Sequence, residues 1–445
     1  MQIKMSRMTD SSSAEGLLEE IRRLKSIECG SEEAKTSFAF DEGYTFLNHG
    51  SYGTYPIAVR DVYRHFQERS EAQPDTFVRY EYRPNLLDAS RRVIADYLNV
   101  PVETCVYTVN ASMGIDTVLR NITYEPGDVI LCFTSIYGSF GYTIQHLTET
   151  TPAEAKPIAL EYPISDEFVV KAFQNAIEEV LAEGKKPRLA LFDTISSLPA
   201  VRVPFEQLTK ICKQYGIFSC IDGAHGVGHM PLDLRTLDPD FFSSNLHKWL
   251  HVPRGCAIIY TPGRNQHLLR TTFPTGFGFV AQPDPPNYVA NFANLGTLND
   301  TSYLCIEAAL EWRKKLTWNG KAGEEAIMSY TLYLAKTGGQ AVASILGTEV
   351  MDNSEHTLAQ CGMTNVRLPV SLQSGSERSK SLSTTAAWIQ RTMTFEHKTA
   401  VNAFVYGNCI WVRLSAQVYL NVSDFERAGH ALKAVCERAM QEKTG

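Results

Sequence analysis

The hydrophobic pattern changes at Phe46, where short apolar runs begin to alternate with longer amphipathic stretches. The apolar runs are rich in β-branched and aromatic residues, as buried strands are, and the amphipathic stretches are typical of helices. Strands separated by helices favour right-handed βαβ crossovers and a largely parallel sheet. The predicted strands are Val106–Val109, Asp128–Phe133, Lys156–Glu161, Arg188–Asp193, Phe218–Asp222 and Phe241–Asn245, and the predicted helices are a segment ending at Asn121, Tyr142–Leu147, Glu167–Ala182 and Phe205–Tyr215.

The same pattern predicts three parts of the chain, with boundaries near residues 45 and 280. Residues 1–45 are polar and predict a mobile N-terminal tail, including Met8–Ser13, followed by a surface helix over Ala14–Lys25. Residues 46–280 carry the predicted large domain, and residues 281–445 predict a smaller domain that mixes helices and strands. The elements expected in this smaller domain are a helix over Tyr303–Leu316, strands over Asn365–Leu368 and Cys409–Leu414, and an exposed Ser- and Lys-rich loop over residues 370–385.

The composition is that of an ordinary globular protein. Of the 445 residues, 44% are hydrophobic and 20% are charged, which excludes disordered, collagen-like and coiled-coil chains. A net charge of −7 favours neither nucleic acid nor an anionic membrane as a partner. No run approaches the ~18 apolar residues of a membrane-spanning helix, and the N-terminus lacks the apolar core of a secretory signal. The ten cysteines show no CxxC spacing and lie mostly in apolar runs, which predicts small buried side chains and a reducing, cytoplasmic location.

Polar residues directly after predicted strands are the candidates for chemistry, because ligands bind at the carboxyl ends of strands in an open α/β sheet. Lys248 follows the strand that ends at Asn245 and lies between a histidine and a tryptophan. Desolvation there lowers the pKa of the amine and favours a Schiff base, while an ordinary surface lysine is the alternative. Asp222 ends an earlier strand, where a carboxylate can keep a heterocyclic nitrogen protonated or can simply cap a turn or helix.

Two further positions fit the binding of anions. Residues 109–114, Val-Asn-Ala-Ser-Met-Gly, form a turn of small residues between a predicted strand and a predicted helix. The Ser112 hydroxyl and backbone N–H groups at such a helix N-terminus can bind phosphate, although an ordinary N-cap serine has the same pattern. Arg413 lies in an otherwise apolar strand and needs an anionic partner, which is either a substrate carboxylate or a structural salt bridge.

These candidates together predict pyridoxal 5′-phosphate as the cofactor. It needs an amine for a Schiff base, a charge partner for its pyridinium nitrogen and a seat for its phosphate. Lys248, Asp222 and the turn around Ser112 supply one of these each.

Several motifs resemble class V of the fold-type I pyridoxal-phosphate enzymes, over about Phe46 to Arg427. They are Leu47-Asn-His-Gly-Ser51, Asp222-Gly-Ala-His225, His247-Lys248 and Arg413-Leu-Ser415. Ile136-Tyr-Gly138, Ile195-Ser-Ser197, Pro253-Arg-Gly255 and Leu414-Ser-Ala-Gln-Val-Tyr419 are similar to the fungal cysteine desulfhydrase-like and hercynylcysteine sulfoxide lyase-like branch, while the Asp-Gly-Ala-His form is similar to isopenicillin N epimerase-like proteins. The resemblance implies an α/β fold in which helices flank a mostly parallel seven-stranded sheet, with a smaller C-terminal α+β domain.

The resemblance also implies roles for residues that contact the cofactor. Lys248 is expected to form the imine with the cofactor and then to shuttle a proton. Asp222 is expected to pair with the pyridinium nitrogen, and His225 to lie near the phenolic oxygen. The residues expected to hold the phosphate are Ser112, Met113 through its N–H, and His247.

Thr297 resembles a residue that reaches the phosphate of a neighbouring subunit, which implies a homodimer with shared active sites. Tyr137 resembles a residue that lies over the cofactor ring and acts as a general acid, and a core aromatic is the alternative. Arg413 is expected to bind the α-carboxylate of an amino-acid substrate, with Asn48 and His49 at its entrance. The walls of the pocket are expected from residues 44–54, 77–83 and 272–280, including Phe77, Arg79, Tyr80 and Phe277.

The expected reaction is β-elimination from a cysteine-like amino acid through a quinonoid carbanion, which makes the protein a C–S lyase. The same carbanion can be epimerised or can form a C–C bond or ring, as in fungal specialised metabolism of the loline alkaloid type. An inactive protein that binds the cofactor is the third alternative.

Two departures from the family pattern narrow the predicted reaction. Residues 362–408 lack the loop cysteine of persulfide-forming desulfurases, and His225 replaces the Gln that is usual in the ergothioneine branch.

Overall fold

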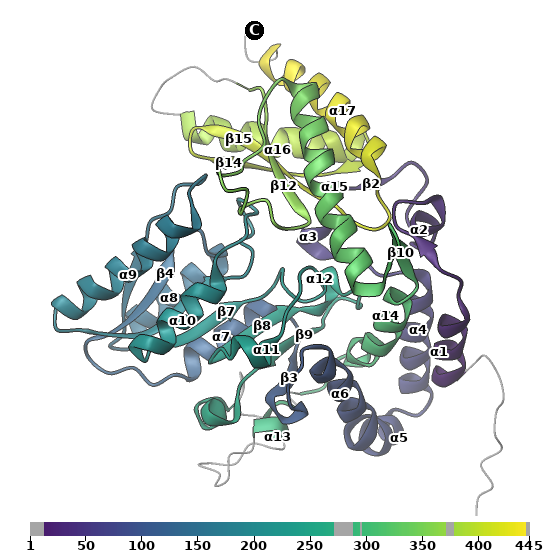
Figure 1. Ribbon diagram of the computed structural model, residues 1–445. Coiled ribbons are helices and arrows are strands. Elements are labelled where there is room, and N and C mark those ends of the chain that lie inside the picture. Colours follow the sequence, from purple (N-terminus) through teal and green to yellow (C-terminus); the bar gives the residue numbers. More distant parts are fainter. Residues whose placement is uncertain (1–12, 271–287, 294–295, 371–377, 442–445) are drawn as a thin grey trace, which may run out of the picture.

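Seven strands form a central sheet in the computed structural model, which describes residues 13–270, 288–293, 296–370 and 378–441 (Figure 1). The strand β9 is antiparallel to both of its neighbours, and every other neighbouring pair is parallel. This confirms the predicted mostly parallel seven-stranded sheet. In spatial order the strands are β3 (Cys105–Thr108), β9 (Ala257–Tyr260), β8 (Phe241–Asn245), β7 (Phe218–Asp222), β6 (Lys186–Asp193), β4 (Asp128–Phe133) and β5 (Glu154–Ile158).

Helices cover both faces of this sheet, so its strands are buried on two sides. Along β4, Ile130 packs into the core with α7 (Ala111–Asn121) and α8 (Gly138–Thr150), whereas Leu131 packs into the core with α9 (Asp166–Ala182) and α10 (Phe205–Tyr215). Successive side chains point to opposite faces of a strand, so burial of both faces requires the continuous apolar runs seen in the sequence.

The C-terminal part forms a second, smaller layer of helices and strands, drawn in green to yellow in Figure 1. Its antiparallel sheet has the order β12 (Met363–Arg367), β15 (Cys409–Ser415), β14 (Asn402–Tyr406), which confirms the predicted C-terminal α+β layer. The helices that pack with these strands are α15 (Gly323–Leu346), α16 (Arg378–Glu396) and α17 (Val422–Gln441).

N-terminal residues pack against distant parts of the chain. The helix α1 (Ala14–Arg23) lies against α4 (Ile57–Ala72) and α14 (Ile306–Arg313). The remaining elements are β1 (Ile27–Glu28), α2 (Glu32–Thr36), β2 (Thr45–Phe46), α3 (His49–Tyr52), α5 (Pro74–Thr76), the π-helix η1 (Phe77–Leu86), α6 (Leu87–Tyr97), η2 (Val102–Thr104), α11 (Leu234–Leu237), α12 (Leu246–Trp249), η3 (Gly263–Leu268), α13 (Tyr288–Phe292), η4 (Thr301–Cys305), β10 (Leu316–Trp318), β11 (Lys321–Ala322) and β13 (Thr399–Ala400).

One predicted segment is a helix as expected but ends early, and another is wrong in kind. The helix expected over Tyr303–Leu316 is a 3₁₀ turn followed by α14, and Leu316 already belongs to β10, which pairs with β1. Within the loop expected over 370–385, residues from Arg378 onward form the start of α16, and Leu382 and Thr385 are buried. Tertiary contacts outweigh local composition in both places. The domain boundary near residue 280 lies outside the described residues.

Nine of the ten cysteines are buried and Cys409 is half-buried, as expected for small apolar side chains. In the described parts of the chain, no helix is long and apolar enough to cross a membrane.

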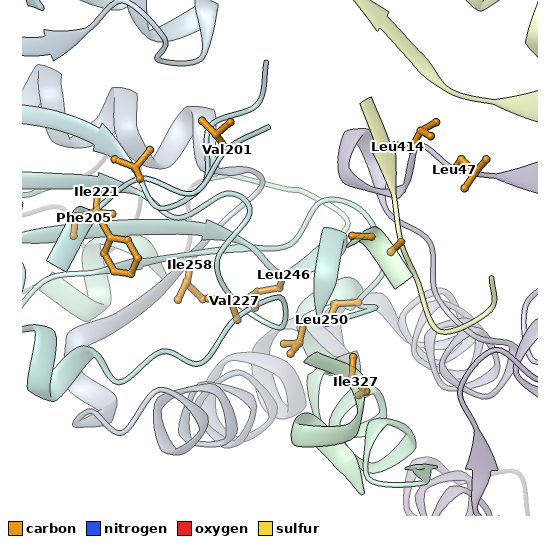
Figure 2. Packing of buried hydrophobic residues seen from close by; sticks show 14 of the residues in the cluster. Leu47, Val201, Phe205, Ile221, Val227, Leu246, Leu250, Ile258, Ile327 and Leu414 are labelled. Carbon is orange, nitrogen blue, oxygen red and sulfur yellow. The ribbon is translucent and has the colours of Figure 1, made fainter. Parts of the chain in front are cut away.

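Leu246 and Leu250 lie on either side of Lys248 in the sequence, and Figure 2 shows both among buried side chains that include Val227 and Ile258. The core therefore holds the short helix that carries Lys248.

Candidate active site

Lys248 lies in the short helix α12, directly after the carboxyl end of β8. Its amine faces a cavity of about 290 Å³ that Ser112, Tyr137 and Asp222 also line. Burial, assisted by the positive charge of Arg413 and opposed by Asp222, lowers the pKa of Lys248 to about 8. About a tenth of the amine is therefore neutral at pH 7, far more than for an ordinary lysine, and this fraction can attack a carbonyl.

His225 contacts Lys248 from the turn after β7. Its Nδ1 accepts a hydrogen bond from Trp249 Nε1 at 3.2 Å, so the ring carries its proton on Nε2. That nitrogen lies 3.4 Å from Lys248 Nζ. Burial and the positive charge of Lys248 hold the pKa of His225 well below its usual value, so the ring is neutral. His229 stacks on Trp249 with ring centroids 3.6 Å apart, which fixes the indole that orients His225.

Asp222 ends β7 and points into the same cavity as Lys248. Its Oδ1 accepts a hydrogen bond from the Ala224 N–H at 2.9 Å. Burial raises the pKa of Asp222, although the Ala224 amide, the charge of Lys248 and a hydrogen bond with Asp193 oppose that effect. The carboxyl group is thus placed where the sequence predicted a partner for a ring nitrogen.

The predicted phosphate turn is the N-terminus of α7, and Ser112 there lines the cavity. The N–H of Met113 donates to Asn110 Oδ1 at 2.8 Å as part of the helix cap, and its predicted contact with phosphate stays a prediction. Asn245 Oδ1 accepts the Ala111 N–H at 2.9 Å and ties the turn to β8. A Cβ on Gly114 would lie 2.1 Å from a side-chain atom of β8, so glycine permits this close approach.

His247 lies beside Lys248 and also lines the cavity. Its Nδ1–H donates to the backbone oxygen of Cys256 at 3.0 Å, which leaves Nε2 as the other ring nitrogen. Burial lowers the pKa of His247 to about 4, so the ring is neutral. A phosphate dianion accepts hydrogen bonds, so His247 would bind it best after taking up a proton at Nε2.

Arg413 is a buried cation on β15, with an exposed fraction of 1%. Its Nη2 donates to Asn48 Oδ1 at 2.9 Å and to Ser51 Oγ at 2.7 Å, and its Nη1 donates to the Ser197 backbone oxygen at 3.0 Å. These acceptors are neutral, and the buried Nε has no hydrogen-bond partner. Burial accordingly lowers the pKa of Arg413 to about 10. In the part of the chain that the structure describes, no carboxylate forms an ion pair with Arg413.

His49 does not lie at the entrance of the substrate site, where it was predicted together with Asn48. It is fully buried, its Nε2–H donates to the backbone oxygen of Lys248 at 2.7 Å, and its Nδ1 accepts from the Tyr419 hydroxyl at 3.0 Å. Burial lowers the pKa of His49 to about 3, so this neutral ring supports the Lys248 backbone from below. Asn48 is also buried, and its Oδ1 accepts hydrogen bonds from Arg413 Nη2 and, at 2.8 Å, from the Ser51 hydroxyl, whereas residues 50–52 line the cavity.

Tyr137 precedes α8, lines the cavity and is 45% exposed, which contradicts the alternative of a core aromatic. Thr297 lies elsewhere: it is exposed and lines a separate hollow of about 560 Å³ together with Phe77, Val78 and Arg83. Residues 77–83 therefore do not line the cavity of Lys248 within one chain. The remaining predicted wall, residues 272–280 with Phe277, lies outside the described residues.

Sequence analysis missed several residues that shape the cavity. Asp193 is the last residue of its strand, as Asp222 is of the next one along the chain, and that shared position was a readable signal. Asn245 ends β8 in the same way. Three other residues, Asn110, Ser51 and Ser197, lie in motifs noted in the sequence but had no role predicted for them, and Asn402 lies outside those motifs.

The residues present fit pyridoxal phosphate. The cavity holds a lysine with a lowered pKa, a buried carboxyl group opposite it and the N-terminus of a helix for an anion. Arg413 does not line the cavity itself, but Ser51 and Ser197, which do, hold its guanidinium group directly behind the wall. Each polar group that the cofactor and an amino acid require therefore has a counterpart, which defines the class of fold-type I pyridoxal-phosphate enzymes.

Comparisons with known proteins agree with this class. The family model for aminotransferase class-V matches residues 52–371. The chain is 36% identical over 442 residues to the L-cysteine desulfhydrase-like protein lolT1 of Epichloe uncinata, covering 92% of this chain and 96% of that protein. It is 28% identical to the hercynylcysteine sulfoxide lyase of Schizosaccharomyces pombe, over 91% and 97% of the two chains.

Among solved structures, an apo cysteine desulfurase from Thermococcus onnurineus NA1 has the same fold, with a TM-score of 0.71 and 16% identity. The match covers 93% of this chain and all of that one. The chain belongs to the aminotransferase class V family. This confirms the family, the fold and the pyridoxal-phosphate cofactor that the motifs predicted.

Proposed function

We propose that this protein is a pyridoxal-phosphate-dependent C–S lyase that acts on cysteine or an S-substituted cysteine. The observation that carries the proposal is the buried Arg413, which has no anionic partner among the described residues, contacts the cavity residues Ser51 and Ser197, and lowers the pKa of Lys248 by its charge. A buried cation of this kind is costly unless a ligand neutralises it, and the α-carboxylate of an amino acid does so.

When bound, the cofactor supplies an aldehyde that captures amines and an electron-withdrawing ring that makes the substrate Cα–H acidic. The protein's own part is to position groups around that chemistry. Arg413 holds the α-carboxylate and thereby orients the Cα–H bond toward Lys248. The neutral amine at Lys248 Nζ removes the Cα proton, and its pKa of about 8 suits a base that works near neutrality. The exposed Tyr137 hydroxyl protonates the departing sulfur.

With cysteine as substrate, the Cα–H and Cβ–S bonds break, sulfide leaves with a proton, and water converts the remaining unsaturated amine to pyruvate and ammonia. Two relatives of this chain carry names that refer to breaking C–S bonds: an L-cysteine desulfhydrase-like protein and a hercynylcysteine sulfoxide lyase. The sequence lacks a cysteine between residues 362 and 408, which favours release of sulfide over its storage as a persulfide on the enzyme.

Incubation of the purified protein with L-cysteine and with S-substituted cysteines tests the proposal directly. We expect stoichiometric pyruvate, ammonia and thiol from at least one of them, and no product from Lys248→Ala. Lys171→Ala, which changes an exposed lysine on α9, is the matched control and should retain activity. A normal cofactor spectrum without pyruvate from any cysteine derivative would reject the lyase and favour epimerisation or ring formation on the same site.

We further propose that the protein works as a homodimer, because Thr297 faces a hollow that is separate from the cavity of Lys248.

 In a dimer, this exposed threonine can reach the phosphate seat of the other copy, where Ser112 and His247 already lie. The cytoplasm, whose reducing conditions suit ten free cysteines, is the proposed location.

Mixing two defective variants tests the shared site. Thr297→Val alone should weaken cofactor binding, and Lys248→Ala alone should abolish activity. In a mixed dimer, one site would combine an intact Lys248 with an intact Thr297 from the other copy, so activity at limiting cofactor should reappear after the subunits are exchanged. If Thr297 served its own chain, no mixture would regain activity.

A further inference from the structure

Asp193 and Asp222 form a pair of buried carboxyl groups at the edge of the central sheet. They end the neighbouring parallel strands β6 and β7 and are partners in the strand register. Their exposed fractions are 2% and 5%, and both line the cavity of Lys248. Their side chains share a hydrogen bond, which requires a proton on one of them.

The surrounding charges decide which carboxyl group carries that proton. Lys248, on α12, acts on Asp222, whereas no cation of the described residues stabilises a charge on Asp193. The other groups that face the pair are neutral: the Tyr162 phenol near Asp193 and the Cys220 thiol near Asp222, whose pKa values burial raises. Burial and the neighbouring carboxylate likewise raise the pKa of Asp193 well above its usual value.

We propose that Asp193 is a positioning residue that remains a carboxylic acid and donates a hydrogen bond to Asp222, which alone carries the negative charge of the pair. The proposal rests on the pyridoxal-phosphate site proposed above. A carboxylate that accepts such a hydrogen bond is less basic than a free one, so it leaves the proton on the ring nitrogen that it faces. Asp193 thus acts on the cofactor through Asp222, without touching it.

Substitutions of Asp193 test whether its hydrogen bond to Asp222 is what matters. Asp193→Asn keeps the size of the side chain and offers an N–H to Asp222, whereas Asp193→Ala removes the donor. Asp193→Val is a second variant without a donor, in case the alanine variant does not fold. The readouts are the ¹⁵N chemical shift of labelled cofactor, which reports protonation of the ring nitrogen, and the pH midpoint of the visible absorbance of the bound cofactor.

We expect the asparagine variant to match the wild-type protein in both readouts. The alanine or valine variant should lose part of the ring-nitrogen protonation, and its absorbance midpoint should rise by about one pH unit, because a hydrogen bond to a charged acceptor is commonly equivalent to about one to two pKa units. A midpoint displaced as far in Asp193→Asn as in Asp193→Ala, or unchanged in all variants, would overturn the role of Asp193. Failure of the wild-type protein to develop the absorbance would overturn the cofactor site itself, which is a distinguishable result.

Discussion

Arg313 and Arg413, the two most deeply buried arginines among the described residues, offer a sharp test of the substrate site. Arg413 is bound only by neutral acceptors, whereas Arg313 forms a forked ion pair with Glu324, at 2.6 Å from each of two guanidinium nitrogens. Arg313 also donates to the backbone oxygens of Trp249, at 2.6 Å, and Gly228, at 2.9 Å. Replacement of each arginine by methionine removes a buried cation of similar size, but the consequences should differ.

For Arg413→Met, we expect little loss of stability. Burial lowers the pKa of Arg413 to about 10, which corresponds to roughly 3 kcal/mol of unfavourable free energy in the charged form. Removal of the charge recovers that amount, while the loss of hydrogen bonds to Asn48, Ser51 and Ser197 costs a similar one. The free energy of unfolding should therefore change by less than about 2 kcal/mol.

For Arg313→Met, two backbone carbonyls lose their donor and the Glu324 carboxylate keeps only the hydrogen bond from the Tyr97 hydroxyl. Removal of one member of a buried pair costs about 3–5 kcal/mol, and because the Glu324 side chain is 34% exposed we expect the lower end of that range and unfolding at clearly lower denaturant concentration. Both variants are to be measured without added cofactor, because bound cofactor would stabilise the folded state by itself.

The effects on substrate binding should have the opposite order, with the larger loss in Arg413→Met. Arg413→Met should raise the KM for cysteine by roughly 10²–10³-fold, because a buried, forked contact with a carboxylate is lost. The KM of Arg413→Lys should lie between those of the wild-type protein and Arg413→Met, because lysine keeps the positive charge but cannot form the two parallel hydrogen bonds of an arginine. An Arg413→Met protein that is as unstable as Arg313→Met, or that keeps the wild-type KM, would refute the assignment of Arg413 to the substrate carboxylate.

Three further outcomes can be checked with simple measurements. Uptake of pyridoxal phosphate by cofactor-free protein should accelerate with rising pH and level off above pH 8, because only the neutral amine reacts and the pKa of Lys248 is about 8; a rate independent of pH between 6 and 8 would contradict this. Ser112→Ala should weaken cofactor binding by about 10- to 100-fold, as expected for one hydrogen bond to a charged group, and unchanged affinity in an absorbance titration would remove Ser112 from the phosphate seat. Gly53→Ala should destabilise the protein in urea far more than Gly127→Ala, since both glycines have positive φ but a Cβ on Gly53 would lie 1.8 Å from the His247 backbone oxygen; equal losses would contradict this packing.

Much of the sheet could be predicted from periodicity alone. The bounds of Asp128–Phe133, Phe218–Asp222 and Phe241–Asn245 were predicted correctly, because continuous apolar runs are required where helices cover both faces of a strand. The helix Phe205–Tyr215 was also predicted correctly from its amphipathic pattern. The helix predicted over Tyr303–Leu316 is present but ends at Arg313, because Leu316 pairs with a strand near the N-terminus.

The chemical character of the site was also legible in the sequence. Lys248 and Asp222 each follow an apolar strand, and parallel strands bring their carboxyl ends to one edge of a sheet. The residues at that edge of the sheet could therefore be assigned to one site from the sequence alone. The same reasoning could have included Asp193, which ends the next strand in register with Asp222.

The direction and surroundings of individual side chains were decided only by the tertiary structure. His49 and Ser51 are two residues apart, yet the first is buried beneath the Lys248 backbone and the second lines the cavity. The N–H of Met113 is used by Asn110, and Arg413 lacks a carboxylate partner among the described residues. Amino-acid order sets which residues form strands and which follow them, because that depends on local periodicity. Hydrogen-bond partners and burial depend on segments hundreds of residues away, and only the packed chain brings those together.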